Sequence, residues 1–125
     1  MKTAAVIALF SIAGGLSRYY FAAWVYNHLG RFFPYGTFAV NIIGAYFIGL
    51  IMELALRTTM IPGTLRVGLT VGLMGGLTTF STFSYETFRL LEEGRVVIAF
   101  ANIVTSVAAC LLLTWLGVVT VRTLT

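Results

Sequence analysis

The stretch GGLTTFSTFSYE, residues 75–86, gathers five Ser and Thr residues around two phenylalanines within an otherwise strongly apolar sequence. It lies in a segment from residue 62 to about residue 88, which is long enough to cross the hydrocarbon core of a bilayer. Backbone that leaves the helix at membrane depth is tolerated only where protein or a water-filled cavity surrounds it. We therefore expect a break at about residues 75–79. The alternative is an intact helix whose hydroxyls bond back to the preceding turn.

The composition indicates an integral membrane protein of one domain, residues 1–125. Hydrophobic residues make up 59% and charged residues 10% of the chain, whereas soluble domains carry about 25% charged residues. The net charge of +4 is dispersed along the chain, which argues against nucleic-acid binding. The lone Cys110 excludes an intramolecular disulfide and lies in an apolar run, where we expect it to pack.

Hydropathy predicts four membrane spans joined by short polar turns, and hence an all-α fold with the third span broken near the bilayer midplane. The predicted spans cover residues 4–27, 35–56, 62–88 and 96–121. The first is expected to be a retained span rather than a cleaved signal peptide, because its apolar stretch continues beyond the small residues that resemble a cleavage site. Gly68, Gly72 and Gly76 recur at intervals of four, which favours close helix packing.

The loop charges indicate almost no preferred orientation. With four spans, one side of the membrane holds four basic residues and the other three, whereas cytoplasmic loops normally carry a clear excess. A chain that inserts both ways can pair as an antiparallel homodimer, which reproduces the inverted repeats of longer transporters. The alternative is a single orientation with a weak charge signal.

Polar residues within the predicted spans are candidates for a path through the membrane. In the fourth span they recur every four residues: Asn102, Ser106, Cys110 and Thr114. Asn41 stands alone in the second span, and its amide offers a donor without a fixed charge. Arg18 either snorkels to the headgroups or faces a vestibule that attracts anions, and Glu86 is an acid that could pair with it.

Phe80 and Phe83 share one helix face and alternate with hydroxyl residues. Such a pair is ordinarily core or lipid-facing. In polar surroundings, however, the positive edges of the rings can attract an anion without the strong binding of an arginine. A hydrated anion must have its water replaced at each step and must still leave, and weak donors that alternate with ring edges meet both requirements.

Three motifs, GGLSRYY (14–20), GTFAVNIIG (36–44) and GLMGGLTTFSTFSYE (72–86), resemble the Fluc (CrcB-type) fluoride channels of bacteria. The resemblance covers nearly the whole chain. It implies a multi-pass protein of the bacterial inner membrane that forms an antiparallel, dual-topology homodimer with two fluoride pores. It also implies passive export: HF enters neutral, ionises in the cytoplasm, and fluoride leaves down its electrochemical gradient.

The resemblance also implies roles for individual residues. A structural sodium ion would be bound at the dimer centre by the backbone carbonyls of Gly75 and Thr78, contributed by both copies. Arg18 would lie in the vestibule, and Glu86 is added as a candidate acid beside the pore. The fluoride pore would be lined by Phe80, Phe83, Asn41, Ser81, Thr82, Ser106, Thr114 and Asn102. The Asn102 position is commonly aromatic in relatives, which makes its role less defined than the others.

Three other classes of function fit the sequence less well. A small proton-coupled exporter of cationic compounds needs a membrane-embedded carboxylate, and the middle of the first span has none, which leaves Glu86 alone. An enzyme is not expected, because His28 has no second metal ligand near it in the sequence and no nucleophile–base pair is evident. A purely structural subunit is disfavoured by the polar stripe of the fourth span.

Overall fold

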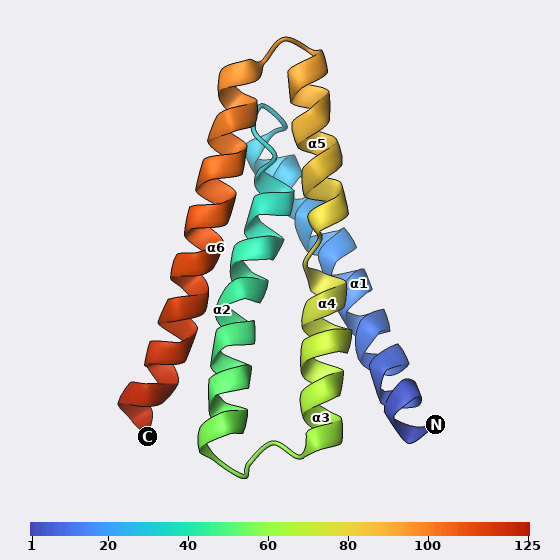
Figure 1. Ribbon diagram of the computed structural model, residues 1–125. Coiled ribbons are helices and arrows are strands. Elements are labelled where there is room, and N and C mark those ends of the chain that lie inside the picture. Colours follow the sequence, from blue (N-terminus) through green and yellow to red (C-terminus); the bar gives the residue numbers. More distant parts are fainter.

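The computed structural model describes all residues 1–125 and is built of helices alone (Figure 1). The predicted all-α class is therefore confirmed. The elements in chain order are α1 (Lys2–Leu29), α2 (Tyr35–Arg57), α3 (Gly63–Val67), η1 (Gly68–Met74), α4 (Gly75–Leu77), α5 (Phe80–Glu92) and α6 (Val96–Leu124).

Three helices are long and apolar enough to cross a membrane: α1, α2 and α6. They contain the predicted first, second and fourth spans almost residue for residue. Gly30 ends α1 with φ of 80°, a conformation that favours glycine, and Pro34 precedes α2, where its missing N–H costs least. The protein is therefore a multi-pass membrane protein.

The remaining segment, residues 63–92, is a helical rod that is interrupted once. Its first half ends in a π-helical stretch, η1, followed by the short α4, and its second half is α5. Between the halves the backbone is extended at Thr78 (ψ 159°) and Thr79 (φ −152°, ψ 116°). The alternative of an intact helix is thus wrong. The break is also narrower than expected, because residues 75–77 remain helical.

Small residues let the helices approach closely, as the glycine spacing predicts. A Cβ atom added to Gly14 of α1 would lie 2.3 Å from the carbonyl oxygen of Leu73, and one added to Gly76 would lie 3.0 Å from the backbone nitrogen of Gly15. Between α2 and α6, a Cβ on Gly49 would meet the carbonyl oxygen of Thr114 at 2.2 Å. Backbones this close are typical of helix packing in membranes. There the hydrophobic effect does not drive helices together, and small residues allow the close van der Waals packing that does.

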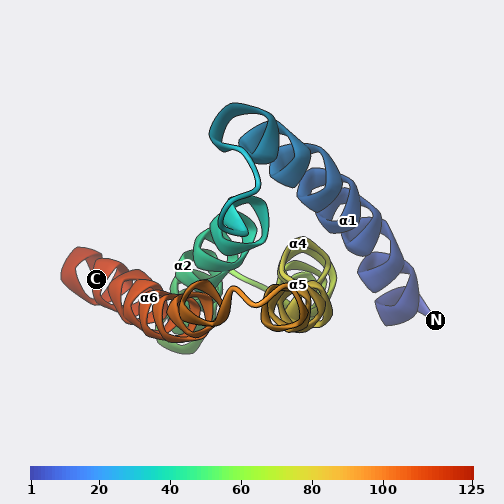
Figure 2. The same cartoon turned by 90° about the horizontal axis from the view of Figure 1, so that it is seen from above.

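Two helix pairs organise the molecule: α2 packs along α6, and α1 packs against η1 and α4. Viewed from above, α2 lies in the middle, with α6 on one side and α1 on the other (Figure 2). The interrupted rod and α6 are joined by the turn at Gly94 and lie apart toward their other ends (Figure 1). Few side chains are buried, and large apolar residues along α1, α5 and α6 are exposed, as expected of helices whose outer faces meet lipid or a second chain.

Candidate functional site

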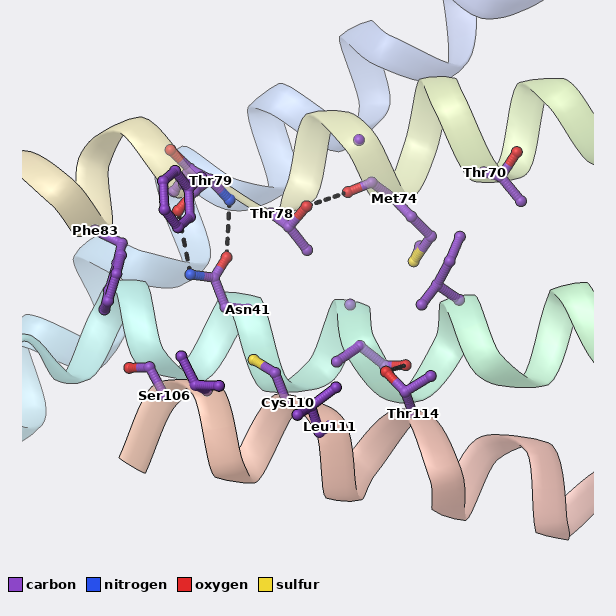
Figure 3. Close-up of a pocket in the computed structure, with 16 residues that line it drawn as sticks. Asn41, Thr70, Met74, Thr78, Thr79, Phe83, Ser106, Cys110, Leu111 and Thr114 are labelled. Carbon is purple, nitrogen blue, oxygen red and sulfur yellow. Dashed lines mark hydrogen bonds between the residues drawn. The ribbon is translucent and has the colours of Figure 1, made fainter. Parts of the chain in front are cut away.

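The break in the rod is held by the side chain of Asn41 on α2 (Figure 3). Its Oδ1 accepts a hydrogen bond from the backbone N–H of Thr79 at 2.8 Å, and its Nδ2 donates to the Thr79 carbonyl oxygen at 3.2 Å. An unpaired backbone group away from water is costly, and more so in lipid. The side-chain amide therefore gives Thr79 the partners that an unbroken helix would have supplied.

The hydroxyl of Thr79 caps the N-terminus of α5. Its Oγ1 accepts the backbone N–H of Thr82 at 3.1 Å and lies 2.9 Å from the hydroxyl of Thr82 and 3.3 Å from that of Ser81. Threonine is a favourable N-cap residue because its oxygen satisfies a backbone donor that has no helical acceptor. Two polar side chains, Asn41 and Thr79, thus stabilise the end of one half-helix and the start of the next.

These caps release two carbonyl groups. In an α-helix the N–H groups of Thr79 and Thr82 would bond to the carbonyls of Gly75 and Thr78. Here they bond to the side chains of Asn41 and Thr79 instead. The carbonyl oxygens of Gly75 and Thr78 are consequently free of those helical donors, at the C-terminal end of a half-helix whose dipole favours a cation.

A groove of about 520 Å³ opens beside the break, between the interrupted rod, α2 and α6 (Figure 3). Phe83, Asn41 and Ser106 lie at one end of it, and Thr70 and Thr114 at the other. Its lining mixes apolar side chains with hydroxyls, a thiol and an amide, and contains no charged residue. The groove thus offers weak hydrogen-bond donors along an otherwise apolar surface.

Phe80 and Phe83 both line this groove, with ring centroids 5.5 Å apart and a tilt of 40° between the rings. The Phe80 side chain is 77% exposed and that of Phe83 is half-buried. In a membrane protein, an aromatic ring this exposed meets either lipid or a second protein chain. Ser81 is exposed and Thr82 half-buried beside them, and neither lines the groove.

The predicted stripe of α6 divides between the groove and the protein interior. Ser106, Cys110 and Thr114 line the groove, and the Thr114 hydroxyl donates to the Ala45 carbonyl oxygen at 3.0 Å. Asn102 does not line it: the residue is 1% exposed, and its Nδ2 donates to the hydroxyl of Thr87 at 2.8 Å. The four-residue spacing therefore identified three groove residues and one buried residue.

Glu86 is engaged by two hydroxyl groups rather than by Arg18. The Tyr26 hydroxyl donates to one carboxylate oxygen at 2.7 Å, and the Thr37 hydroxyl donates to the other. Arg18 is half-buried and forms none of the ion pairs of the chain. The Arg18–Glu86 pair that the sequence allows is thus not formed, and hydroxyl groups of α1 and α2 bind the carboxylate instead.

A second, smaller cavity of about 260 Å³ lies at the end of the molecule where the α1–α2 loop meets α5. Its lining includes Glu86 and three arginines, Arg31, Arg89 and Arg95. The guanidinium of Arg31 stacks over the Tyr26 ring at 4.2 Å, and Arg89 and Arg95 pair with Glu93. This cavity leads to the carboxylate of Glu86, and most of its charges are compensated locally.

Other polar residues in or next to the predicted spans have structural partners. Glu53 is buried and forms an ion pair with Arg122 at 2.5 Å. His28 bonds to the carbonyl oxygen of Trp24 at 2.9 Å. The chain forms no group of three or more His, Cys, Asp or Glu side chains that could hold a metal ion. The groups suited to a cation at the break are therefore backbone carbonyls.

The sequence of the chain matches known proteins over nearly its whole length. The family model described as "CrcB-like protein, Camphor Resistance (CrcB)" matches residues 5–118. The chain belongs to the CrcB-like family. This membership confirms the family resemblance inferred from the three motifs, and the interrupted helix with its two phenylalanines lies within the matched residues.

Several relatives carry the same name, "Fluoride-specific ion channel FluC". The protein from Trichlorobacter lovleyi is 71% identical over 124 residues, which cover 99% of this chain and 99% of the relative. The proteins from Pelobacter propionicus and Geotalea daltonii are 67% and 62% identical, and cover 99% and 98% of this chain and 96% and 98% of their own lengths. An ion-channel family is not a class of enzymes, which agrees with the expectation that this chain has no catalytic activity.

Sequence reasoning did not assign a role to three residues of the site. Tyr26 and Thr37 hold Glu86, and Thr87 joins Asn102 to α5. Thr37 had a sequence signal, since it lies one helical turn before Asn41. Tyr26 and Thr87 had none, because each acts through a partner that is distant in the sequence or on another helix.

Proposed function

We propose that this protein is a passive, selective fluoride channel of the bacterial inner membrane, which exports cytoplasmic fluoride and so relieves its toxicity. The observation that carries the proposal is the capped break beside a groove that contains Phe80 and Phe83. Family membership and the names of relatives with 62–71% identity support fluoride as the ion.

The groove has the properties that permeation of a small hydrated anion requires. Its lining supplies hydroxyl and amide groups and two aromatic rings, and it holds no fixed cation that would trap the ion. Conduction requires binding that is strong enough to replace water and weak enough to permit departure. The N-terminus of α5 begins at Phe80 and directs the positive end of its helix dipole to the same place.

The working unit is a homodimer of antiparallel copies, each with four spans of which the third is the interrupted rod. The nearly balanced loop charges support insertion in both orientations. The open groove and the exposed ring of Phe80 support coverage by a second copy. An in-plane two-fold axis would duplicate the path and give two pores, with Arg18 in the vestibules.

A sodium ion fits the carbonyl groups released at the break. Unwound carbonyls at the C-terminal ends of half-helices are the groups that coordinate Na⁺ in membrane proteins. Gly75 and Thr78 supply two such oxygens in each copy, and two copies related by the axis would supply four. When bound, the ion would link the two copies and compensate the exposed negative ends of their half-helices.

The test of the function is efflux from liposomes that contain the purified protein, measured with a fluoride electrode in the presence of a potassium ionophore. We expect rapid fluoride efflux that needs no proton gradient, and no comparable chloride efflux from matched vesicles. Absence of fluoride efflux, or equal chloride efflux, would contradict the proposal. Fluoride movement that requires an opposing proton gradient would instead favour a coupled exporter.

The test of the assembly uses a single cysteine near the C-terminus. In the Cys110→Ser background, Thr125→Cys is labelled in sealed vesicles with a membrane-impermeant maleimide, before and after permeabilisation. Dual topology predicts that about half of the chains are labelled before permeabilisation. Labelling of all chains or of none would show a single orientation, and light scattering of the purified protein reports whether it is a dimer.

A further inference from the structure

A chain of buried hydrogen bonds joins α6 to the backbone of Phe83. The Ser106 hydroxyl donates to Asn102 Oδ1 at 3.1 Å, and Asn102 Nδ2 donates to the Thr87 hydroxyl at 2.8 Å. The Thr87 hydroxyl in turn donates to the carbonyl oxygen of Phe83 at 2.7 Å. Asn102 and Thr87 are 1% and 6% exposed and do not line the groove, whereas Ser106, the first member of the chain of bonds, does.

The position of Thr87 on α5 gives this chain of bonds its significance. Phe83 lies four residues after Thr79 and four residues before Thr87, and residues at i and i+4 share a helix face. Thr79 is bound by Asn41 from α2, and Thr87 is bound by Asn102 from α6. Two asparagines on two different helices therefore hold α5 one turn to either side of Phe83.

A third polar contact of α5 is made by Glu86, which accepts hydrogen bonds from the hydroxyls of Tyr26 on α1 and Thr37 on α2. The helix packs against α6 and, over a shorter stretch, against α2. Its amphipathic outer face is exposed at Tyr85 and Phe88. A buried, fully paired polar contact fixes geometry strongly, because any rotation would leave its donors and acceptors unsatisfied.

We propose that Asn102, acting through Thr87, is a positioning residue that sets the orientation of Phe83 and does not itself contact the permeating ion. This differs from the pore-lining role that the spacing along the fourth span suggested for Asn102. Its consequence for ion transport rests on the proposed channel function. Its consequence for the placement of Phe83 does not.

The first arm of the test measures the position of the ring directly. Para-fluorophenylalanine is incorporated at position 83, and fluorine NMR spectra of the purified protein are compared for Asn102→Leu, Thr87→Val and Thr87→Ser. We expect Asn102→Leu and Thr87→Val to displace the resonance in the same direction, and Thr87→Ser, which keeps the hydroxyl, to restore it. Thr105→Val is the matched control, because Thr105 is exposed on α6 and its hydroxyl bonds only to its own helix.

The second arm measures fluoride efflux for the single variants and for the double variant. Each of Asn102→Leu and Thr87→Val should lower the rate by about tenfold or more, which corresponds to about 1.4 kcal/mol in the barrier. If Asn102 acts through Thr87, the double variant is no slower than the slower single variant, because both changes remove the same contact.

Two outcomes would overturn the proposal. One is an unchanged Phe83 resonance in both Asn102→Leu and Thr87→Val. The other is a double variant whose rate falls by the product of the single effects, which would show that Asn102 acts on the ion independently. If Asn102→Leu does not fold, Thr87→Val alone tests the proposal, because valine has the same shape as threonine. The proposal then requires the Phe83 resonance to move in Thr87→Val. A wild-type protein without fluoride efflux would contradict the channel function, and the NMR arm would still test the positioning role.

Discussion

The side-chain amide of Asn41 and the peptide group of Thr79 form a reciprocal pair, with the two hydrogen bonds at 2.8 and 3.2 Å. The pair imitates the contact between two peptide groups and connects α2 with the break in the rod. Asn41 thereby has a structural duty in addition to its place in the groove lining.

Asn41→Asp tests both duties. The aspartate keeps the oxygen that accepts the Thr79 N–H, but it replaces the donor with an oxygen that repels the Thr79 carbonyl and adds a negative charge to the groove. We expect fluoride efflux to fall by about tenfold or more, since a polar group left without its hydrogen-bond partner at this half-buried position costs about 1–3 kcal/mol, and more when it is charged. Asn27→Asp is the control, because it adds the same charge at an exposed position near the end of α1. An unaffected rate in Asn41→Asp would place the residue outside the path.

Thr79→Ala should weaken the response to sodium. Without the capping oxygen, the Thr82 N–H is free to return to the Thr78 carbonyl, which withdraws one of the proposed sodium ligands. An N-cap hydroxyl contributes about 1 kcal/mol, so the sodium concentration for half-maximal thermal stabilisation should rise roughly fivefold. Thr79→Ser should behave like the wild type. Identical sodium titrations for the alanine variant and the wild type would contradict the proposed carbonyl site.

Phe80→Ile and Phe83→Ile should each abolish or severely reduce fluoride efflux while the oligomeric state is preserved. Isoleucine keeps much of the volume and apolar character but lacks the positive ring edge that attracts an anion. Phe88→Ile is the matched control, because Phe88 lies on the same helix, is 55% exposed and does not line the groove. Full transport in both pore variants would remove the rings from the path.

Gly14→Ala should destabilise the protein where Gly15→Ala does not. The new Cβ at Gly14 would lie 2.3 Å from the carbonyl oxygen of Leu73, whereas a Cβ at Gly15 meets nothing within 4 Å. Overpacking of this kind costs about 1–3 kcal/mol. The thermal unfolding midpoint in detergent should therefore fall for Gly14→Ala only, and equal midpoints would show that α1 can shift away from η1 without cost.

Features that depend on local composition could be predicted from the sequence. The long helices follow from runs of apolar residues, and the break follows from the cluster of hydroxyls at residues 78–84. The family follows from the motifs around Arg18, Asn41 and Phe80. Each of these signals lies within one contiguous segment, so no knowledge of the partners across the fold was needed.

Features that depend on the choice of a partner could not be predicted. Thr79 lies 38 residues from Asn41, and Glu86 lies 60 residues from Tyr26. The sequence offers both hydroxyl groups and Arg18 as partners for the carboxylate of Glu86. Only the packing of α1 and α2 shows that hydroxyl groups bind it. Asn102 shares a four-residue spacing with three groove residues. Because an α-helix has 3.6 residues per turn, residues with this spacing turn gradually around α6, and Asn102 faces α5 instead of the groove. The π-helical stretch η1 likewise had no signal in the sequence pattern.

The order in which the chain is synthesised conflicts with the order in which its helices find their main partners. The face of α1 around Gly14 packs against η1, which is synthesised later, and α2 packs mainly against α6, which emerges last from the ribosome. The first two helices must therefore remain in the translocon or the lipid with these packing faces uncovered until η1 and α6 have been synthesised. A chain terminated before residue 96 would lack the principal support of α2, and membrane quality-control proteases should recognise it as incomplete.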